Sequence, residues 1–409
     1  MTNLHFNYKD VFRAGRLGFS AKKMWIVFLG FLVGYIGYDI LSYLAYIAAG
    51  IEIGEIWQIF RLMPMFPVDA LWPWYSWVIW IVGAIWWICV SLLVGVAVSK
   101  ITYEQLKGDE FYEIKDALKF AMKTGKSAIL APFVLILFIL SLVVMGLILA
   151  LITRIPWFGV VFFAVMSIPA FAVCLFILYL VLVTLVALLI GPSIVGATGN
   201  DTFDTLFESF SVINDQPWRF ITYQVLLQGV IIAGVVILAF FSAKAIFLGR
   251  AIIGIVLPME KLDNILMNAA YYVKLIIPPF YPESWQGMFR NFIDWIGMPN
   301  LLYPLEYMPP VEGFAGGLSS IILGAVYYFI VMFVSSLACS IYWAGNTVIF
   351  TVLVKKKDEK NLLEIKEEPL EEKPEEPEAA DKAEEKKVKR GRKKEDEKEE
   401  EKPEPKEGA

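Results

Sequence analysis

Residues 160–190 read VVFFAVMSIPAFAVCLFILYLVLVTLVALLI and contain no charged side chain. An α-helix needs about 20 apolar residues to cross the hydrocarbon core of a bilayer, and this stretch is longer than that. Within lipid, the backbone of such a segment satisfies its own hydrogen bonds only as a helix. Residues 160–190 therefore predict a membrane-spanning helix, with Pro169 as a candidate position for a kink.

The rest of the chain repeats this signal. Hydrophobic residues make up 58% of the sequence and the mean hydropathy is +0.61, an apolar excess over soluble domains, which are roughly half apolar. We predict six spans, at about residues 24–49, 77–98, 129–153, 160–190, 220–243 and 318–354. The expected fold class is all-α, a polytopic membrane protein whose membrane domain covers residues 24–354.

Lysine and arginine residues distinguish the two sides of the predicted bundle. They gather in the amphipathic segment 1–23, in the 99–128 loop and directly after the last span, whereas the short alternate loops hold only Arg61 and Arg154. Cytoplasmic loops carry such an excess of positive charge. With six spans, both termini are predicted to be cytoplasmic, the first span to be an uncleaved anchor, and the loop 244–317 to be non-cytoplasmic.

The three predicted cytoplasmic stretches follow one pattern. Each has an aspartate, Asp10, Asp116 or Asp204, with a large apolar residue two positions later, and enters the next span about 12 to 16 residues further on. We interpret them as three units of one plan, each a surface helix followed by a transmembrane hairpin. A triplication would produce this pattern, and so would chance similarity among hairpins.

The third unit differs in charge. Its surface helix, DTFDTLFESFSVINDQPWRF at residues 201–220, has four acidic residues before its only cation. The first two surface helices are basic and are expected to lie against an anionic leaflet, where each Lys or Arg contributes about 1 kcal/mol. The third gains nothing there, so its apolar face predicts docking on protein. The candidate docking residues are Asp204, Phe207, Glu208, Phe210, Trp218 and Arg219.

The same helix carries a family resemblance. The pattern D-x-F-D-x-L-x-x-S-F followed by P-W-R, within residues 201–219, resembles a segment of loosely related bacterial membrane proteins that share no agreed activity. The six-span layout is similar in plan to the membrane region of some glycerophosphodiester phosphodiesterases, whose catalytic domain has no counterpart in this sequence. The resemblance implies a multi-pass protein of the bacterial cytoplasmic membrane and implies no activity.

Three polar residues within the predicted spans, Asp39, Gln224 and Gln228, form a candidate intramembrane site. Asp39 lies roughly 20 Å along its helix from Met24, past the middle of the bilayer. Intramembrane carboxylates often mark ion or proton paths. The alternative is a carboxyl at the outer interface, and the lack of a basic partner in the sequence favours it. Gln224 and Gln228 are one turn apart, a spacing that favours interhelical hydrogen bonds over a solute site.

The sequence predicts no catalytic residue, no cofactor and no metal. His5 is the only histidine, which excludes a multi-histidine metal site and histidine general-base catalysis. The segment GKS at 125–127 lacks the first glycine of a phosphate-binding loop, because Phe120 stands at that position. Three cysteines lie within apolar runs without metal-ligand spacing: Cys89, Cys174 and Cys339. We therefore expect a protein that is not an enzyme.

Residues 355–409 differ in composition from the rest of the chain. They hold 17 of the 36 basic and 21 of the 41 acidic residues and are rich in Glu, Lys and Pro, which predicts a disordered cytoplasmic tail. A basic island at 386–394, KKVKRGRKK, is interpreted first as part of a solvated tail, with contact to anionic lipid, an acidic partner or nucleic acid as the alternatives. Its acidic flanks argue against nucleic acid.

These observations favour a structural, assembly or membrane-organising component whose partners are membrane lipids and a protein bound at 201–220 or at the tail. The alternative is a transporter or channel for a small or amphiphilic solute with Asp39 in its path. Solute flux in proteoliposomes would distinguish the two.

Overall fold

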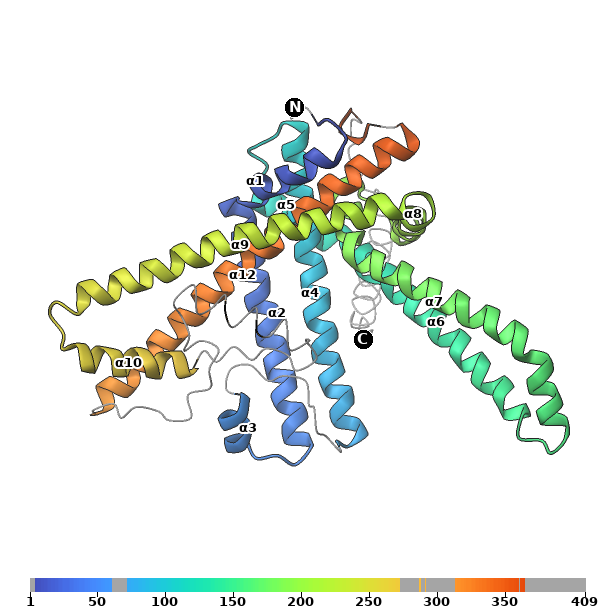
Figure 1. Ribbon diagram of the computed structural model, residues 1–409, viewed down its shortest axis with the longest axis horizontal. Coiled ribbons are helices and arrows are strands. Elements are labelled where there is room, and N and C mark those ends of the chain that lie inside the picture. Colours follow the sequence, from blue (N-terminus) through green and yellow to red (C-terminus); the bar gives the residue numbers. More distant parts are fainter. Residues whose placement is uncertain are drawn as a thin grey trace, which may run out of the picture. The chain divides into compact units, whose positions relative to one another are not determined.

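The computed structural model describes residues 4–60, 72–272, 287, 291, 313–359 and 361–364 (Figure 1). Every element within these ranges is a helix, which confirms the all-α prediction. The basic island, the tail from residue 365 onward and much of the loop 244–317 lie outside the described residues. Residues 355–359 and 361–363, which were predicted to begin the tail, belong to the first compact unit of the chain, Met1–Leu363.

Six helices are long and apolar enough to cross a membrane, as the sequence predicts. They are α2 (Ala21–Ala48), α4 (Trp74–Lys107), α6 (Lys126–Ile152), α7 (Phe158–Thr198), α9 (Pro217–Ile253) and α12 (Gly313–Asp358). In chain order they form three pairs whose members contact each other, α2 with α4, α6 with α7, and α9 with α12.

A short helix precedes the first helix of each pair. The 3-10 turn η1 (Tyr8–Phe12) and α1 (Arg13–Gly18) precede α2, α5 (Ile114–Thr124) precedes α6, and α8 (Thr202–Asp215) precedes α9. The predicted plan of three units, each a short helix and a hairpin, is therefore the observed one. The remaining described elements are α3 (Ile53–Phe60), α10 (Met259–Tyr272) and η3 (Leu362–Glu364).

Local sequence signals set the ends of these helices. The carboxylate of Asp201 accepts a hydrogen bond from the backbone N–H of Asp204 (2.9 Å), which caps the start of α8. Helix α9 begins at Pro217, whose fixed φ suits the first helical position. Helix α7 ends at Gly199, with φ +70°, a left-handed conformation that glycine adopts without strain.

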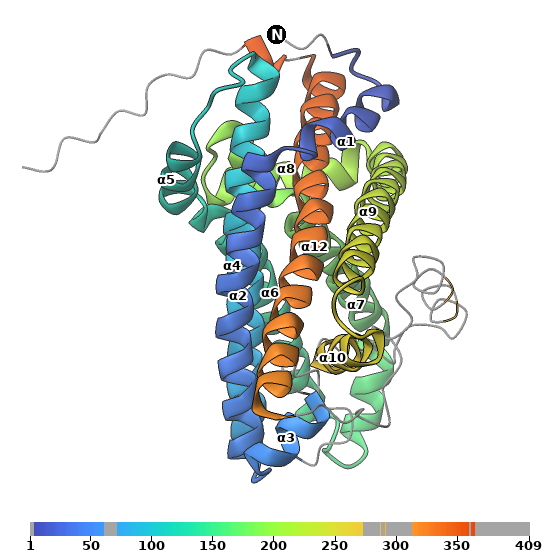
Figure 2. The same ribbon diagram turned by 90° about the vertical axis from the view of Figure 1, so that its left-hand side faces the viewer.

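The second helix of each hairpin builds a common core. Helices α4, α7 and α12 contact one another near the end of the unit where α1, α5 and α8 lie (Figures 1 and 2). A Cβ atom on Gly95 of α4 would lie 2.8 Å from Trp343 and 2.9 Å from Pro192. The three helices therefore meet at a point where only glycine fits. The hydroxyl groups of Ser99 and Ser193 add a hydrogen bond of 3.2 Å between α4 and α7.

The same register recurs in the three core helices. Gly95, Gly191 and Gly345 are all buried, one in each helix. The residue three positions after each glycine is a fully buried β-branched side chain: Val98, Ile194 and Val348. The three core helices thus share a buried glycine followed three positions later by a buried β-branched residue, in addition to the order of elements, which agrees with the interpretation of one repeated plan.

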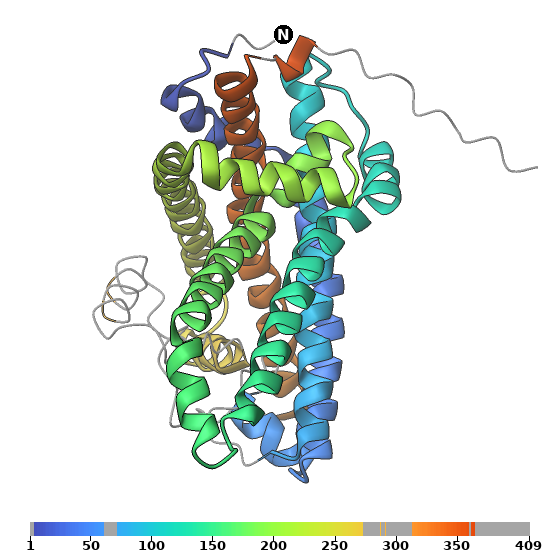
Figure 3. The same cartoon turned by 90° about the vertical axis from the view of Figure 1, so that its right-hand side faces the viewer.

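Beyond the core, the hairpins differ in how they pack. Glycines let α2 and α4 approach each other closely, with Gly30 against Val94 and Gly37 against Trp86. The hairpin of α6 and α7 instead leaves the core, and most large apolar side chains between Phe133 and Phe176 are exposed (Figures 1 and 3). Such a surface is the kind that lipid covers.

Candidate functional site

Asp39 lies on the face of α2 that turns toward α4 and α12. The ring of Tyr35, one turn away, contacts Trp87 of α4 (centroids 5.9 Å apart) and Tyr328 of α12 (5.3 Å). Oδ1 of Asp39 is buried and has no hydrogen-bond partner among the described residues. Ser42, the next residue on this face, is also buried. A buried carboxylate oxygen with an unused lone pair can take a proton or a polar ligand.

Gln224 belongs to a different part of the molecule. Its side-chain amide donates a hydrogen bond to Oδ1 of Asn346, which joins α9 to α12. Tyr328 and Asn346 are 18 residues apart on α12, roughly 27 Å along a helix. Asp39 and Gln224 therefore do not form one site. Gln228 is exposed on α9 and joins neither group.

Asn346 is a residue that sequence reasoning missed. It is fully buried within a helix long enough to span a membrane, and its Nδ2 atom has no hydrogen-bond partner among the described residues. An asparagine within the predicted span 318–354 was the available signal, because a buried amide needs a partner on a neighbouring helix. The partner is the side chain of Gln224, one of the two glutamines that the sequence singled out.

The predicted docking helix α8 is partly covered by the chain itself. Leu206 is buried against α6 and α7, and the ring of Phe210 lies 6.0 Å from that of Tyr179 on α7. Phe207 is 69% exposed and Trp218, in the first turn of α9, is 79% exposed. The apolar face of α8 thus divides into a half that packs on the α6–α7 hairpin and a half that remains open.

Acidic residues of α8 face the end of α12. The carboxylate of Asp215 lies 3.8 Å from Nζ of Lys357. Burial raises the pKa of the half-buried Glu208 carboxyl, an effect that Lys357 opposes and that nearby Asp358, Asp204 and Asp215 increase. Arg219 and Asp204 are exposed on the same stretch of chain. Part of the negative charge of α8 is therefore balanced within the chain, by Lys357.

Buried polar residues beside the core were also missed. Lys23, at the start of α2, is fully buried, and its Nζ donates hydrogen bonds to the backbone oxygen of Leu17 (2.8 Å) and to Oε1 of Gln105 (2.9 Å). The hydroxyl of Tyr103 donates to the backbone oxygen of Leu362 (2.7 Å), which fixes η3 against α4. Lys23 looked like one of several cations that mark the cytoplasmic side, and nothing in the sequence separated it from them.

Comparison with known proteins adds no assignment. Protein-family models, curated proteins and solved structures give no match to this chain. Within the described part of the chain, no group of three or more His, Cys, Asp or Glu side chains lies close enough to hold a metal ion. The contacts and exposed surfaces of the chain itself are therefore the observations that bear on its function.

Proposed function

We propose that this chain is a non-enzymatic, membrane-organising component of the bacterial cytoplasmic membrane, with both termini in the cytoplasm. The observation that carries the proposal is that each short helix beside a hairpin leaves large apolar side chains exposed. They are Phe12 and Phe19 beside α1, Leu118 and Met122 on α5, and Phe203 and Phe207 on α8. Such side chains favour burial at the boundary between lipid headgroups and acyl chains.

The position of these helices supports an effect on one leaflet. Each directly precedes the first helix of a pair of membrane-spanning helices. Because a pair of spans returns the chain to the side from which it started, all three short helices meet the membrane on the same side. The helices α4, α7 and α12 join the three units through one packed core. Three inserted helices that are held together add area to one leaflet without adding it to the other, and amphipathic insertion of this kind is sensitive to membrane curvature.

Charge gives the helices different partners in this proposal. Helix α5 carries exposed Lys115, Lys119 and Lys123, which suit an anionic leaflet. Helix α8 inserts Phe203 and Phe207 at the interface in this proposal, and its exposed Asp204 and the exposed Arg219 that follows it are left for a protein partner. The charged tail would supply a second contact for the same partner.

Vesicle reconstitution tests the membrane-organising role. At matched protein-to-lipid ratios, the wild-type chain is expected to reduce the mean diameter of phosphatidylglycerol–phosphatidylcholine vesicles in electron micrographs. The double variant Phe203→Ser, Phe207→Ser should lose much of this effect. The control, Phe111→Ser with Phe314→Ser, changes two equally exposed aromatic residues outside the three short helices. Vesicles of equal diameter with and without protein would disprove the role.

A transporter is the second candidate, favoured by one observation. Oδ1 of Asp39 is buried without a partner among the described residues, as expected of a carboxylate that binds a proton or cation in transit. In that case proteoliposomes should show proton or cation flux that Asp39→Asn abolishes. Gln228→Ala, which changes an exposed residue of α9, serves as the control.

A further inference from the structure

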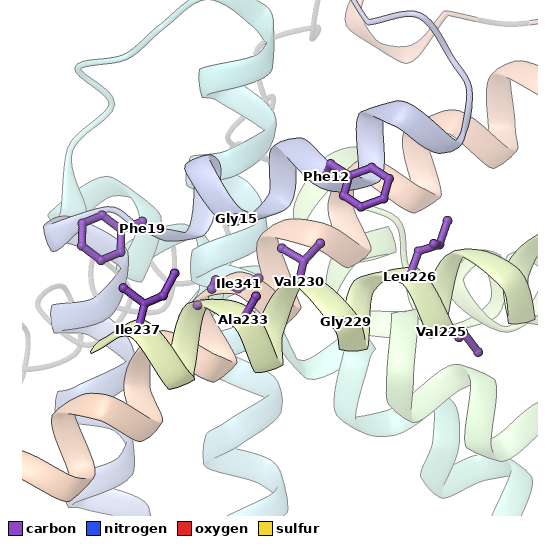
Figure 4. Close-up of a pocket in the computed structure, with 11 residues that line it drawn as sticks. Phe12, Gly15, Phe19, Val225, Leu226, Gly229, Val230, Ala233, Ile237 and Ile341 are labelled. Carbon is purple, nitrogen blue, oxygen red and sulfur yellow. The ribbon is translucent and has the colours of Figure 1, made fainter. Parts of the chain in front are cut away.

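An apolar groove runs between the start of the chain and α9 (Figure 4). Its volume is about 530 Å³, within the range of about 300–1,000 Å³ that ligand pockets occupy. Phe12, Gly15 and Phe19 form one wall, and α9 forms the other between Val225 and Ile237. The groove lies beside α1, one of the short helices that we expect to lie at the membrane surface.

Small residues on α9 create the groove. Gly229 and Ala233 follow Val225 at intervals of four residues, so they lie on the same face of the helix. A Cβ atom on Gly229 would meet no other atom within 4 Å, which shows that the space beside it is open. Leucine at this position would project into that space.

A second apolar groove adjoins the first. Its volume is about 520 Å³, and Phe19 lines both grooves. The second groove continues past Lys22 and Trp25 to Leu238 of α9, the residue after Ile237. Phe19, which is 65% exposed, thus lies between two grooves of similar size.

Two cations belong to the segment that lines these grooves. Arg16 is exposed in α1, one residue after Gly15, which lines the first groove. Lys22 lines the second groove, and its Nζ lies 3.5 Å from the backbone oxygen of Glu110, so it retains the capacity to donate further hydrogen bonds. Two apolar grooves near cationic side chains are complementary to an anionic amphiphile with two acyl chains.

We infer that the two grooves together bind one anionic diacyl phospholipid, with one acyl chain on each side of Phe19 and the phosphate beside Arg16 and Lys22. With the orientation that the lysine and arginine distribution predicts, this lipid comes from the cytoplasmic leaflet, which is rich in anionic lipid. The inference does not depend on the proposed function, because a scaffold and a transporter could each hold such a lipid.

Photocrosslinking tests the occupant directly. The purified full chain is reconstituted into phosphatidylcholine vesicles that contain a small fraction of phosphatidylglycerol with a photoreactive group on one acyl chain. Crosslinks are expected in the peptides that contain Phe12–Trp25 and Val225–Leu238. An equal fraction of the matching photoreactive phosphatidylcholine should label these peptides several-fold less.

Two substitutions test the contact with the acyl chains and the contact with the headgroup separately. Gly229→Leu should reduce labelling at least threefold, whereas Gly249→Leu, on the same helix and also in open space, should leave it unchanged. Arg16→Gln should reduce the preference for phosphatidylglycerol roughly fivefold, the equivalent of about 1 kcal/mol for one basic residue near an anionic lipid. Lys119→Gln, which removes an exposed cation of α5, should preserve the preference.

Several results would overturn the inference. Equal labelling by the two lipids in the wild-type chain would show ordinary contact with bulk lipid. Unchanged labelling in Gly229→Leu would place the acyl chain elsewhere. Absence of lipid crosslinks from both peptides in the wild-type chain would show that something other than lipid occupies the grooves. The Arg16→Gln comparison keeps the inference testable should Gly229→Leu fail to fold, because Arg16 is exposed.

Discussion

The core formed by α4, α7 and α12 and the hairpin formed by α6 and α7 are both built from long apolar helices, yet they differ in how they meet their surroundings. In the core, glycine and serine stand where helices cross, as Gly95 does against Trp343 and Ser99 against Ser193. In the outer part of the hairpin, large aliphatic and aromatic side chains are exposed on both helices. Apolar content therefore indicates that a helix is removed from water, by lipid or by protein. The small residues indicate which part of the helix contacts protein.

Enlarging one glycine in each region should produce the largest difference between them. Gly95→Leu places atoms where Trp343 and Pro192 already lie, so it should destabilise the chain by about 3 kcal/mol or more. Gly146→Leu, in α6, adds the same atoms to open space and should have little effect on stability. Thermal unfolding in detergent measures both. Equal unfolding temperatures for the two variants would mean that α4, α7 and α12 do not meet as described.

A smaller loss of stability is expected where η3 packs against α4. Tyr103→Phe removes the hydroxyl that donates to the backbone oxygen of Leu362, a loss of about 1 kcal/mol. Amide hydrogen exchange around Leu362 and Leu363 should accelerate, because their attachment to α4 is weakened. Tyr75→Phe removes a hydroxyl from a tyrosine that is 45% exposed and should leave this exchange unchanged. Unaltered exchange in Tyr103→Phe would place η3 away from α4.

The smallest predicted effect concerns pH at α8. Because burial raises the pKa of Glu208 above its ordinary value of 4.5, the charged carboxylate destabilises the docked helix at neutral pH. Protonation relieves this cost as the pH falls through the raised pKa, and the contribution levels off below pH 4.5, where the unfolded state is protonated as well. Amide exchange in α8 should therefore slow relative to the rest of the chain on mild acidification.

Glu208→Gln should remove this dependence, since the amide carries no charge at any pH. Glu113→Gln, at an exposed position before α5, is the control and should retain the wild-type dependence. A wild-type dependence in Glu208→Gln would assign the effect to another acid of α8.

The spans were predictable from sequence because the bilayer sets a minimum apolar length that six segments satisfy. The ends of the spans were less predictable. The second span was predicted to end at residue 98, whereas α4 continues to Lys107. Ser99 and Thr102 looked like the start of a polar loop, but both are buried: Ser99 shares a hydrogen bond with Ser193 of α7, and Thr102 donates to the backbone oxygen of Val98 within α4.

The packing partners could not be predicted, for a related reason. A helix that is apolar on all sides shows no periodic face, so its sequence does not say which side meets protein. Gln224 was recognised as a residue that hydrogen-bonds between helices, but its partner Asn346 is separated from it by 122 positions. Phe207 and Phe210 were both candidate docking residues, and only the folded chain shows that Phe210 packs against Tyr179 of α7 whereas Phe207 is exposed.

The bond from Tyr103 to Leu362 has a consequence for the order of assembly. Because Leu362 and Leu363 belong to the same buried cluster as Val11 and Leu106, the cluster is complete only when the last part of the first compact unit has left the ribosome. Synthesis of residues 199–363 takes on the order of ten seconds or more at about 5–20 residues per second. If the hairpins enter the membrane in chain order, the surfaces of α4 and α7 that meet α12 stay uncovered until the third hairpin packs against them, which makes that hairpin the last to join the core.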